Sequence, residues 1–459
     1  MAKRASLYTA LSMAGVLGLM AACSAEDHAT APLTPSGAAV LSRSGSEGED
    51  DGENERAERG AWRFTPLASS AVCTMGGDPV KPLVLPVGYD QRVIASEPSY
   101  ADVPDMNVQN ETGPQAGRYL YRVHEVGSNG SLSVTDLVTG VTKTIAQRAD
   151  WESLDPTAWT PWGTLLFAEE ANTARFRDPA YPAAVGGLVY EVFFAKGDPT
   201  VVERVVARPA IGSKSHEGMR FDSKGNLYSI SERTPGYLFK FVPDRKGDLS
   251  EGQTYVLRIT TPDGDRTGDA EWVPLDRAAV QVDASVAADA VHATGYGRPE
   301  DVEMSFGHSG SAKDDRFYVA ITSEHRVLAV DLGKDRPNEP ATAHVSQYVR
   351  AGVNAPADFE MPDNLVLDSA GNLYIAEDPG SNFAGGKRKG DDIWVAAPST
   401  GGAYAPSSSV VRFASLTDCE AEPTGIYFDR NSDRLFVNIQ HRCGDMLDKT
   451  MAVFRTGAR

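Results

Sequence analysis

Long apolar runs are scarce in this sequence of 459 residues. Only residues 7–22 form a mostly apolar stretch, and no later segment approaches the roughly eighteen apolar residues of a membrane-spanning helix. Basic residues are also in deficit, because 44 Lys and Arg stand against 63 Asp and Glu, for a formal net charge of −19. A chain this acidic lacks the basic surface that a phosphate backbone requires, so we exclude nucleic acid as a partner.

The motifs of several enzyme classes are missing as well. The sequence contains no G-x-x-x-x-G-K-[ST] phosphate loop, no G-x-S-x-G nucleophile elbow and no H-E-x-x-H zinc motif. Covalent serine hydrolysis therefore has no support. Long amphipathic helical patterns are also absent, and short strand-like segments separated by Gly, Asp, Asn and Pro turns fill most of the chain, which is typical of an all-β fold.

The first 22 residues have the features of a secretion signal. Lys3 and Arg4 precede the apolar stretch, which ends in Met20-Ala21-Ala22-Cys23. A cysteine after two alanines predicts lipidation of Cys23, and the alternative is an ordinary signal peptide with a chance cysteine. Ser24 favours transfer to an outer membrane, so we expect an exported lipoprotein at the periplasmic or cell-surface side of that membrane.

Residues 23–60 resemble a disordered tether. They include the run 47–59, which is dense in Glu, Asp, Gly and Ser and has no aromatic residue. Such a segment buries too little apolar surface to offset the entropy of ordering, and its charges keep it extended. We therefore assign 1–22 to the signal peptide, 23–60 to the tether and 61–459 to the folded domain.

Cysteine is rare, with four in the whole chain. An exported protein meets oxidising conditions, so a disulfide is expected among Cys73, Cys419 and Cys443. Cys419 and Cys443 flank a predicted hairpin that would bring their backbones together, and we predict that pair. Pairing of Cys73 with one of the other two is the alternative.

A hairpin repeat organises the folded domain. Residues 216–228 and 362–374 share one spacing, in which a strand, an Asp-x-x-Gly-Asn turn and a second strand follow one another. Looser copies lie at 424–437, 298–319 and 160–167, and residues 119–145 supply one more unit. Each copy is followed by another strand pair. Four strands per unit, repeated around a ring that the termini close, predict a six-bladed β-propeller with four-stranded blades.

The repeat places acidic residues at matching positions. Before the first hairpin strand stand Glu217, Glu300 and Asp363, with Glu422 two residues earlier in its copy. At the end of the second strand stand Glu169 and Glu170, Glu232, Glu324, Glu377 and Asp378, and finally Gln440 and His441. Innermost strands of a propeller surround its channel, so these side chains are expected to converge there. Carboxylates that converge repel one another unless cations neutralise them, and oxygen ligands suit calcium.

Other repeated or adjacent residues have simpler readings. Asp222, Asp368 and Asp429 recur within the turns, and we assign them to turn chemistry. Arg298 suits an anion such as phosphate, because its planar fork matches phosphate oxygens, with an ion pair to a neighbouring acid as the alternative. His216, Asn364, Asp378 and His441 adjoin the acids and are candidates for supporting them.

These segments resemble the PhoX-type alkaline phosphatases and related exported propellers. The matching stretches, spread over 155–445, are Thr160-Pro161-Trp162-Gly163-Thr164 through Glu169-Glu170, His216-Glu217-Gly218, Arg298-Pro299-Glu300-Asp301, Pro362-Asp363-Asn364-Leu365, and Glu422-Pro423-Thr424-Gly425 through His441. The resemblance implies a six-bladed propeller that hydrolyses phosphomonoesters at an iron and calcium centre. It makes Glu170, Glu217, Glu300, Asp363 and Glu422 metal ligands and Arg298 the phosphate-binding group, and Glu169 belongs to the same candidate set.

One position departs from that family. Where its phosphatases have a cysteine that bridges the irons, this chain has Ala168. Without the thiolate, an iron pair loses its soft ligand, so we expect calcium and regard iron as disfavoured.

The sequence therefore predicts an exported, monomeric, phosphatase-like metallohydrolase that acts on a small anionic substrate such as a phosphate ester. A calcium-dependent lactonase or esterase is the alternative enzyme, and a metal-stabilised binding propeller without catalysis is the alternative outside enzymes. Segment 262–297 fits either a blade with long loops or a lid over the channel.

Overall fold

The computed structural model of the protein describes residues 62–306, 315–333, 341–379, 388–442 and 447–457. The predicted signal peptide, the lipidation site Cys23 and the tether all lie outside these residues, and so does Cys443. Within the described residues the elements are strands, apart from one α-helix and two 3-10 turns, η1 (Pro209–Ile211) and η2 (Thr322–Glu324). The expected all-β class is confirmed.

Most strands form consecutive antiparallel runs of four. The first run is β3 (Pro104–Gln109), β4 (Tyr119–His124), β5 (Ser131–Asp136) and β6 (Thr142–Gln147). The second is β7 (Leu154–Trp159), β8 (Leu165–Glu169), β9 (Val189–Ala195) and β10 (Asp198–Ala207). The third is β11 (His216–Phe221), β12 (Leu227–Ser231), β13 (Leu238–Arg245) and β14 (Asp248–Pro262).

The remaining runs follow the same order along the chain. The fourth is β16 (Pro299–Ser305), β17 (Arg316–Ile321), β18 (Arg326–Leu332) and β19 (Thr342–Arg350). The fifth is β20 (Pro362–Leu367), β21 (Leu373–Glu377), β22 (Asp392–Ala396) and β23 (Val410–Leu416). The sixth is β24 (Glu422–Phe428), β25 (Arg434–Gln440) and β26 (Lys449–Arg455), and β2 (Tyr89–Ser96) from the beginning of the domain completes it by pairing with β26.

Two further strands and a helix join these runs. The short β1 (Leu83–Val84) pairs with β23, so the chain before β3 contributes to both the fifth and the sixth run. β15 (Gly268–Pro274) lies between β14 and β19 and merges the third and fourth runs into one nine-stranded sheet. The helix α2 (Ala279–Ala290) packs on β13 and β14 through Val280, Ala284 and Ala288. Segment 262–297 therefore extends a sheet and covers its side. The sequence analysis gave a lid over the channel as one alternative for this segment, and α2 does not form such a lid.

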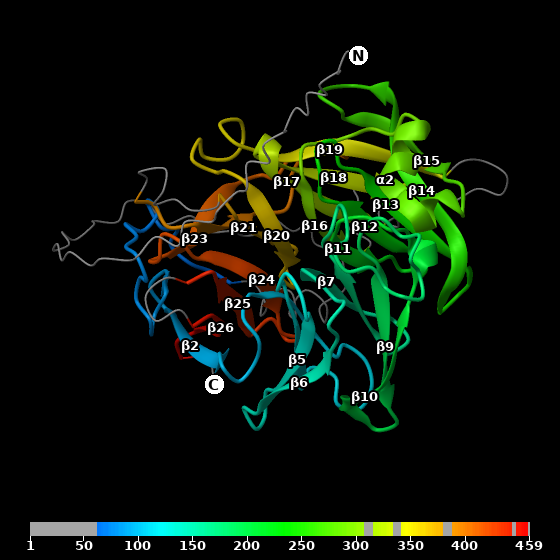
Figure 1. The fold of residues 1–459 in the computed structure, drawn as a ribbon. Helices are drawn as coiled ribbons and strands as arrows, with labels where there is room; N and C mark the ends of the chain where they lie inside the picture. Colours follow the sequence, from blue (N-terminus) through cyan, green and yellow to red (C-terminus); the bar gives the residue numbers. More distant parts are fainter. Residues whose placement is uncertain (1–61, 307–314, 334–340, 380–387, 443–446, 458–459) are drawn as a thin grey trace, which may run out of the picture. The chain divides into compact units, whose positions relative to one another are not determined.

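The first strands of the six runs meet one another. β3 contacts β7, β7 contacts β11, β11 contacts β16, β16 contacts β20, β20 contacts β24, and β24 returns to β3. In Figure 1 the labels β7, β11, β16, β20 and β24 lie around the middle of the ribbon, and the later strands of each run lie farther out. Residues hundreds of positions apart in the sequence are thereby brought together.

Apolar side chains fill the spaces between neighbouring runs. Several aromatic residues lie between the fifth and sixth runs, where Tyr374 packs against Phe413 and Phe428. Trp62 inserts into the same layer and donates its Nε1 hydrogen to the carbonyl of Ser432 at 2.9 Å. The beginning of the described chain is therefore part of the core.

The repeated turn aspartates bind their own turns. Asp222 Oδ1 accepts the backbone N–H of Asn226 at 2.8 Å, and Asp368 Oδ1 accepts that of Asn372 at 2.9 Å. Gly225 has φ of +88°, a conformation that favours glycine. The assignment of these aspartates to turn chemistry is confirmed.

The disulfide prediction was wrong. Cys419 is bonded to Cys73, with Cα atoms 5.0 Å apart, rather than to Cys443. The physical reason is a contact that hairpin spacing does not reveal: Thr74 pairs with Asp418, so the segment before β1 runs alongside the loop between β23 and β24.

Within the described residues no helix is long and apolar enough to cross a membrane.

Candidate metal centre

The acidic residues near the middle of the fold sit in irregular places of the first strands. In five runs the pairing of the first strand with the second shifts register over a short segment, which starts at Pro104, Leu154, His216, Pro299 and Pro362. The residue after each of these is acidic: Asp105, Asp155, Glu217, Glu300 and Asp363. A bulge turns side chains out of the alternating pattern of a strand, so it can aim all five toward the neighbouring first strands. In the sixth run Gly425 has this place, and Glu422 stands earlier, paired with Gln440.

A second set follows the ends of the second strands. The residues directly after β4, β8, β12, β21 and β25 are Glu125, Glu170, Glu232, Asp378 and His441. In the fourth run this place begins the turn η2, and its Glu324 binds Arg266 at 2.7 Å. The sequence analysis grouped Glu324 with the central acids. In the structure its carboxylate instead binds Arg266, in another part of the sheet.

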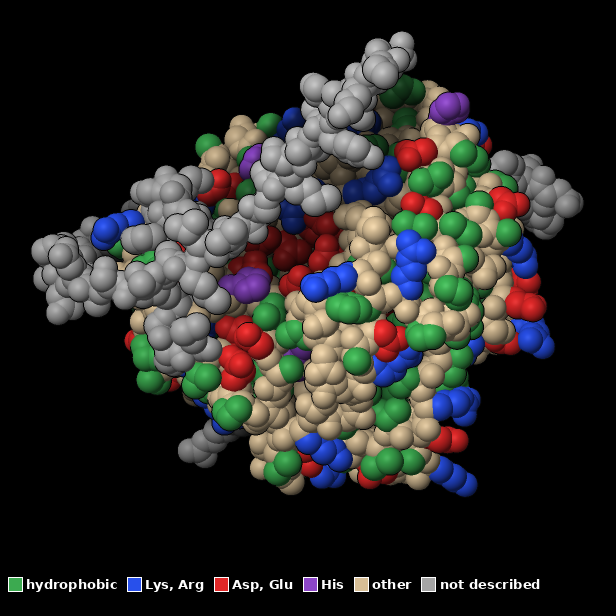
Figure 2. All heavy atoms as spheres, viewed as in Figure 1, with side chains coloured by type: hydrophobic (Ala, Val, Ile, Leu, Met, Phe, Trp, Pro, Cys, Tyr) green, Lys and Arg blue, Asp and Glu red, His purple; other side chains and the backbone are tan. Residues whose placement is uncertain are grey.

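Two groups of three carboxylates share one residue. Oxygens of Glu217, Glu300 and Asp363 lie within 4.8 Å of one another, and so do oxygens of Asp155, Glu170 and Glu217. Glu217 therefore joins four of the six runs to one site. Figure 2 shows acidic side chains gathered in a hollow of the face viewed there.

Glycines allow the first strands to approach closely enough for this. A side chain at Gly218, next to Glu217, would place its Cβ 2.2 Å from Asp301 Oδ1 and 2.3 Å from the backbone nitrogen of Val302. At Gly425, which has φ of +55°, a Cβ would lie 2.3 Å from the carbonyl oxygen of Asp105. The acids are thus close because no side chain separates β11 from β16 or β24 from β3.

Polar groups beside the acids fasten the same strands. Asp301 Oδ2 accepts the N–H of Leu365 at 2.9 Å, which links β16 to β20. Asn364 Oδ1 accepts the N–H of Gly425, which links β20 to β24, and Asn107 donates to the carbonyl of Gly425 at 2.7 Å. The residues next to the acids therefore link the first strands to one another and keep the acids close together.

Burial and mutual repulsion oppose ionisation of these groups. Burial, with the neighbouring Asp155 and Glu300, raises the pKa of Glu217 well above its usual value. Burial, with Glu125 and Glu232 nearby, raises the pKa of Glu170 to about 10. A bound cation would reverse both effects, because it supplies the opposite charge that the cluster lacks.

The donor set fits a hard divalent cation. Asp155 Oδ1 is buried and has no hydrogen-bond partner, and Glu300 Oε1 is buried beside Arg298. Calcium prefers carboxylate oxygens as ligands, and one ion binds several of them at once. Among the described residues there is no free thiol, because Cys73 and Cys419 are bonded to each other. The described residues therefore supply no thiolate that could bridge an iron pair.

Four further carboxylates continue the site toward the sixth run. Burial, with the neighbouring Glu125 and Asp363, raises the pKa of Asp105 well above its usual value. Burial and a hydrogen bond with Asp378 do the same to the pKa of Glu422. His441 Nε2 lies 3.4 Å from Glu422 Oε1, at a side chain that is half exposed.

Arg298 is the cation beside these acids. It has φ of +51° just before β16, its Nε donates to Glu232 Oε1, and its Nη2 lies 3.0 Å from Glu300 Oε1. Burial acts against its charge, but Glu300 and Glu232 raise the pKa of Arg298 above its usual value, so it stays protonated. The ion pair that the sequence left open as an alternative is present, and it holds the guanidinium at the edge of the carboxylate group.

The structure divides the predicted ligand set. Glu170, Glu217, Glu300 and Asp363 come together as expected, and Glu422 lies next to Asp363 and Asp378. Glu169 does not join them: its Oε2 accepts the N–H of Leu188 at 3.1 Å and its Oε1 accepts that of Glu152 at 3.4 Å. Successive residues at a strand end point in opposite directions, so only one of the Glu169 and Glu170 pair can face the centre.

The predicted supporting residues also separate. Asn364 donates to Asp363 Oδ1 at 3.1 Å, and Asp378 and His441 contact Glu422. His216 is buried away from the acids, where its Nε2 lies 3.0 Å from the carbonyl of Gly212, and burial lowers its pKa. Its expected supporting role is therefore not seen.

Three acids escaped the sequence comparison. Asp105, Glu125 and Asp155 belong to the first two runs, whose hairpins lack the Asp-x-x-Gly-Asn turn that identified the others. A signal was present: Pro104-Asp105-Met106-Asn107-Val108 has the same proline and acid order as Pro362-Asp363-Asn364-Leu365-Val366. Matching the strand start rather than the turn would have found it.

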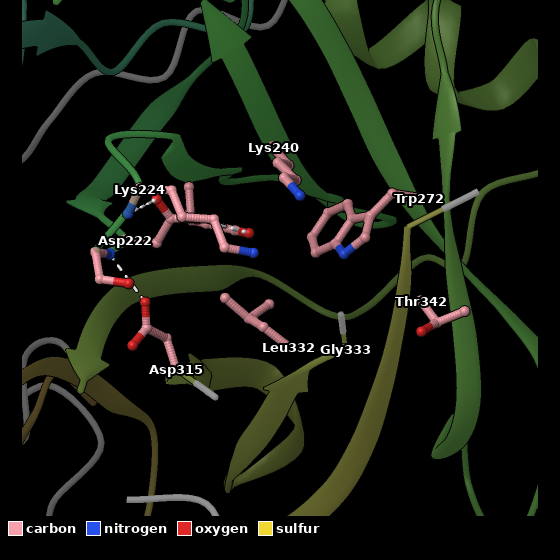
Figure 3. Close-up of a pocket in the computed structure, with 10 residues that line it drawn as sticks. Asp222, Lys224, Lys240, Trp272, Asp315, Leu332, Gly333 and Thr342 are labelled. Atoms are coloured by element: carbon pink, nitrogen blue, oxygen red, sulfur yellow. Dashed lines mark hydrogen bonds between the residues drawn. The ribbon is translucent and has the colours of Figure 1, made fainter. Parts of the chain in front are cut away.

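Cavities elsewhere are lined by other residues. Figure 3 shows a small one of about 40 Å³ between the third and fourth runs, where Lys224 and Lys240 lie near Trp272 and Thr342. A wider cleft of about 510 Å³ lies between the first and second runs and includes Arg118 and Lys143. None of the central carboxylates lines either one.

Comparisons with known proteins place these features in a family. The family model described as alkaline phosphatase PhoX matches residues 157–442. A solved structure of Pseudomonas fluorescens PhoX in complex with vanadate, a transition state analogue, is similar with a TM-score of 0.59 and 18% sequence identity, over 84% of this chain and 98% of that chain. That likeness is one of fold.

A second solved structure is more distant. A gluconolactonase from Xanthomonas campestris has a TM-score of 0.45 and 10% identity, over 85% of this chain and 99% of that chain. No curated protein matches the sequence.

Proposed function

Because this chain belongs to the alkaline phosphatase PhoX family, whose model matches residues 157–442, we propose that it is a phosphomonoester hydrolase with a calcium-containing centre. The family assignment supports a phosphatase-like hydrolase. The shared position of Glu217 in two groups of converging carboxylates is the observation that carries the metal centre.

The centre lies, in this proposal, in the channel of a six-bladed propeller with four-stranded blades. Support comes from the six runs of four strands and from the closed cycle of contacts among their first strands. The sixth run takes β2 from the beginning of the domain, and joining the two ends of a chain in one blade is a way to close such a ring. β15 would then be an addition between two blades.

The carboxylates would divide the work of holding cations. Glu217, Glu300 and Asp363 would hold one, and Asp155, Glu170 and Glu217 another. Glu422 belongs to the adjoining acids and would complete the ligands beside Asp363. Bound there, a divalent metal would polarise phosphoryl oxygens and stabilise the charge that develops on them.

Arg298 would bind the phosphoryl group. Its contacts with Glu232 and Glu300 use Nε and Nη2, which leaves Nη1 for an anionic oxygen. A guanidinium keeps its charge and binds phosphate with directed hydrogen bonds, so its placement beside the acids selects an anion at a site that would otherwise repel one. Glu232 acts through Arg298 by fixing its orientation.

Export and anchoring complete the proposal. Residues 1–22 would be removed as a signal peptide, Cys23 would carry lipid, and 23–60 would hold the domain of 61–459 away from an outer membrane. The basic start, the apolar stretch and Cys23 support this part of the proposal, in which the mature protein is a monomer.

A substrate panel tests the function. The purified mature protein would be assayed with an aryl phosphate, an aryl phosphodiester and a lactone, first with calcium and then after chelation. We expect turnover of the phosphomonoester that calcium restores, and a loss of kcat of about 10²-fold or more in Arg298→Ala, because one preorganised charge at the reacting group is removed. Hydrolysis of the lactone alone would overturn the proposal in favour of the alternative enzyme.

The matched control is an arginine far from the acids. Arg245 ends β13 with a side chain that is 76% exposed and pairs with Asp248. Arg245→Ala should keep wild-type turnover, and both variants should keep wild-type calcium content and circular dichroism. Equal losses in the two variants would show that Arg298 has no special part in the reaction.

A further inference from the structure

One of the six contacts between neighbouring runs differs in character from the rest. Between the sixth and first runs the buried apolar cluster consists of Leu120, Phe436 and Ala452. The other neighbouring pairs share larger apolar clusters. Beyond Leu120, the face of β4 that is turned to the sixth run carries polar side chains instead.

Arg122 is the charged member of this polar layer. It lies in β4 and is fully buried. Its Nη1 donates to Ser133 Oγ at 3.4 Å, and its guanidinium stands over the ring of Tyr100 at 4.8 Å. The Tyr100 hydroxyl in turn lies 3.4 Å from Thr450 Oγ1 of β26, which places the arginine between the two runs.

No carboxylate of the described residues forms an ion pair with Arg122. Other buried arginines of the fold have one: Arg316 binds Asp331 at 2.8 Å, Arg412 binds Asp392 at 2.7 Å, and Arg326 binds Glu324. Buried charges are rare in proteins unless they are paired. Arg122 departs from the pattern that the rest of this molecule follows.

Several donors point into the same layer without a protein acceptor. Nε and Nη2 of Arg122 and the hydroxyl of Ser131 are buried and have no hydrogen-bond partner. Arg122 pairs with Ser133 and His124 pairs with Ser131 across β4 and β5, so all four side chains stand on one face. His124 is already engaged, through Nδ1 with the carbonyl of Asp102 at 3.2 Å and through Nε2 with Ser133 at 2.9 Å.

Of the four side chains Arg122, His124, Ser131 and Ser133, only Arg122 is charged. Burial lowers the pKa of Arg122 to about 10, which leaves it protonated at neutral pH. Burial and the charge of Arg122 lower the pKa of His124 to about 3, so the imidazole is neutral. A single negative charge would therefore neutralise Arg122.

We propose that Arg122 and Ser131 bind a small monovalent anion of the chloride class between β4 and the sixth run. The Nε and Nη2 hydrogens lie along one edge of the guanidinium and can meet the same ion, and the Ser131 hydroxyl adds a third donor. Arg122, Ser131, Ser133 and His124 are all fully buried, so an anion held by them would be enclosed by protein. The anion would link the two runs where the apolar packing is smallest.

Halide dependence of stability tests this site. Thermal unfolding of the mature protein would be followed in sodium chloride and in sodium gluconate at equal ionic strength, with calcium constant. We expect the Tm to be higher in chloride by about 3 °C at a hundredfold excess over Kd, because an ion bound only by the native state stabilises it. The difference should vanish in Arg122→Met, which removes the charge and keeps the length of the side chain.

Arg326→Met is the matched control, because Arg326 is equally buried but is neutralised by Glu324. That variant should lose stability in both salts and keep the chloride effect. If Arg122→Met fails to fold, crystals of the wild-type protein grown in sodium bromide decide the question through the anomalous signal of bromide beside Nε and Nη2.

Equal Tm values in the two salts, or a crystal with ordered water and no bromide at Arg122, would overturn the proposal. Neither result depends on catalysis, so this inference can fail while the proposed function stands.

Discussion

Two consecutive glutamates at the end of β8, Glu169 and Glu170, have different roles. Glu169 and Glu170 are chemically identical, yet Glu169 binds the backbone of Leu188 and Glu152, whereas Glu170 lies with Asp155 and Glu217. Burial raises the pKa of Glu169 to about 8 and that of Glu170 to about 10, so a raised pKa does not tell them apart. The two residues are distinguished by the direction in which each side chain leaves the strand.

Substitution of each glutamate should therefore give a different result. Glu169→Ala leaves two buried N–H groups without an acceptor, and we expect a loss of about 1–3 kcal/mol of unfolding free energy with calcium content unchanged. Glu170→Ala should reduce calcium stoichiometry because it removes a proposed ligand. Chemical denaturation and elemental analysis of the two proteins measure both quantities. Loss of calcium in the Glu169 variant alone would contradict the division.

At the scale of elements, the chain before β3 ties the fold together. β1 extends the fifth run, β2 completes the sixth, and Trp62 packs between them. The bond from Cys73 to Cys419 anchors the same segment to the loop between β23 and β24, across 346 residues of sequence. This segment therefore holds two neighbouring runs in place from outside their first strands.

Removal of the disulfide should weaken that attachment. We expect Cys73→Ser to lower the unfolding free energy by about 2–5 kcal/mol under oxidising conditions, since a long loop of the unfolded chain is no longer closed. Cys443→Ser serves as the control and should have little effect on stability. A larger loss in the Cys443 variant would favour the hairpin pairing that the sequence first indicated.

For the whole molecule, the central feature is negative charge gathered by the closure of six runs. The net charge of −19 is not spread evenly, because the first strands carry acids from five of the six runs to one place. Raised pKa values mean that the native protein without metal retains protons that the unfolded chain releases. Stability without metal and affinity for metal are therefore linked to pH.

The sign of the pH effect follows from these directions. The carboxyl of Glu170 has its pKa raised from 4.5 to about 10, and that of Glu217 is raised well above 4.5, so the chelated native state binds more protons than the unfolded state between those limits. Its stability should fall as pH rises from 5 to 9, by about 1.4 kcal/mol per pH unit for each proton retained. Thermal unfolding in chelator and in calcium over this range measures it, and calcium should flatten the decline.

A variant with one acid fewer provides the control. Glu217→Gln removes a titrating group that both carboxylate groups share, so the decline in chelator should be shallower by about one proton. A Tm that does not change with pH in chelator would show that these carboxylates do not hold protons in the native state.

The spacing of residues along the chain was enough to predict the strands, the hairpin turns and four acids that meet: Glu170, Glu217, Glu300 and Asp363. These follow from local rules, since alternating burial and turn chemistry are written within a few residues. The family was predicted from the resemblance of five short motifs. Other features depended on which strands become neighbours: the partner of Cys419, the direction of Glu169 away from the central acids, the burial of His216 and the addition of Asp105, Glu125 and Asp155. Packing across hundreds of residues settles such choices, because a bulge or a missing side chain at Gly218 decides where a carboxylate points only once the next strand is in place.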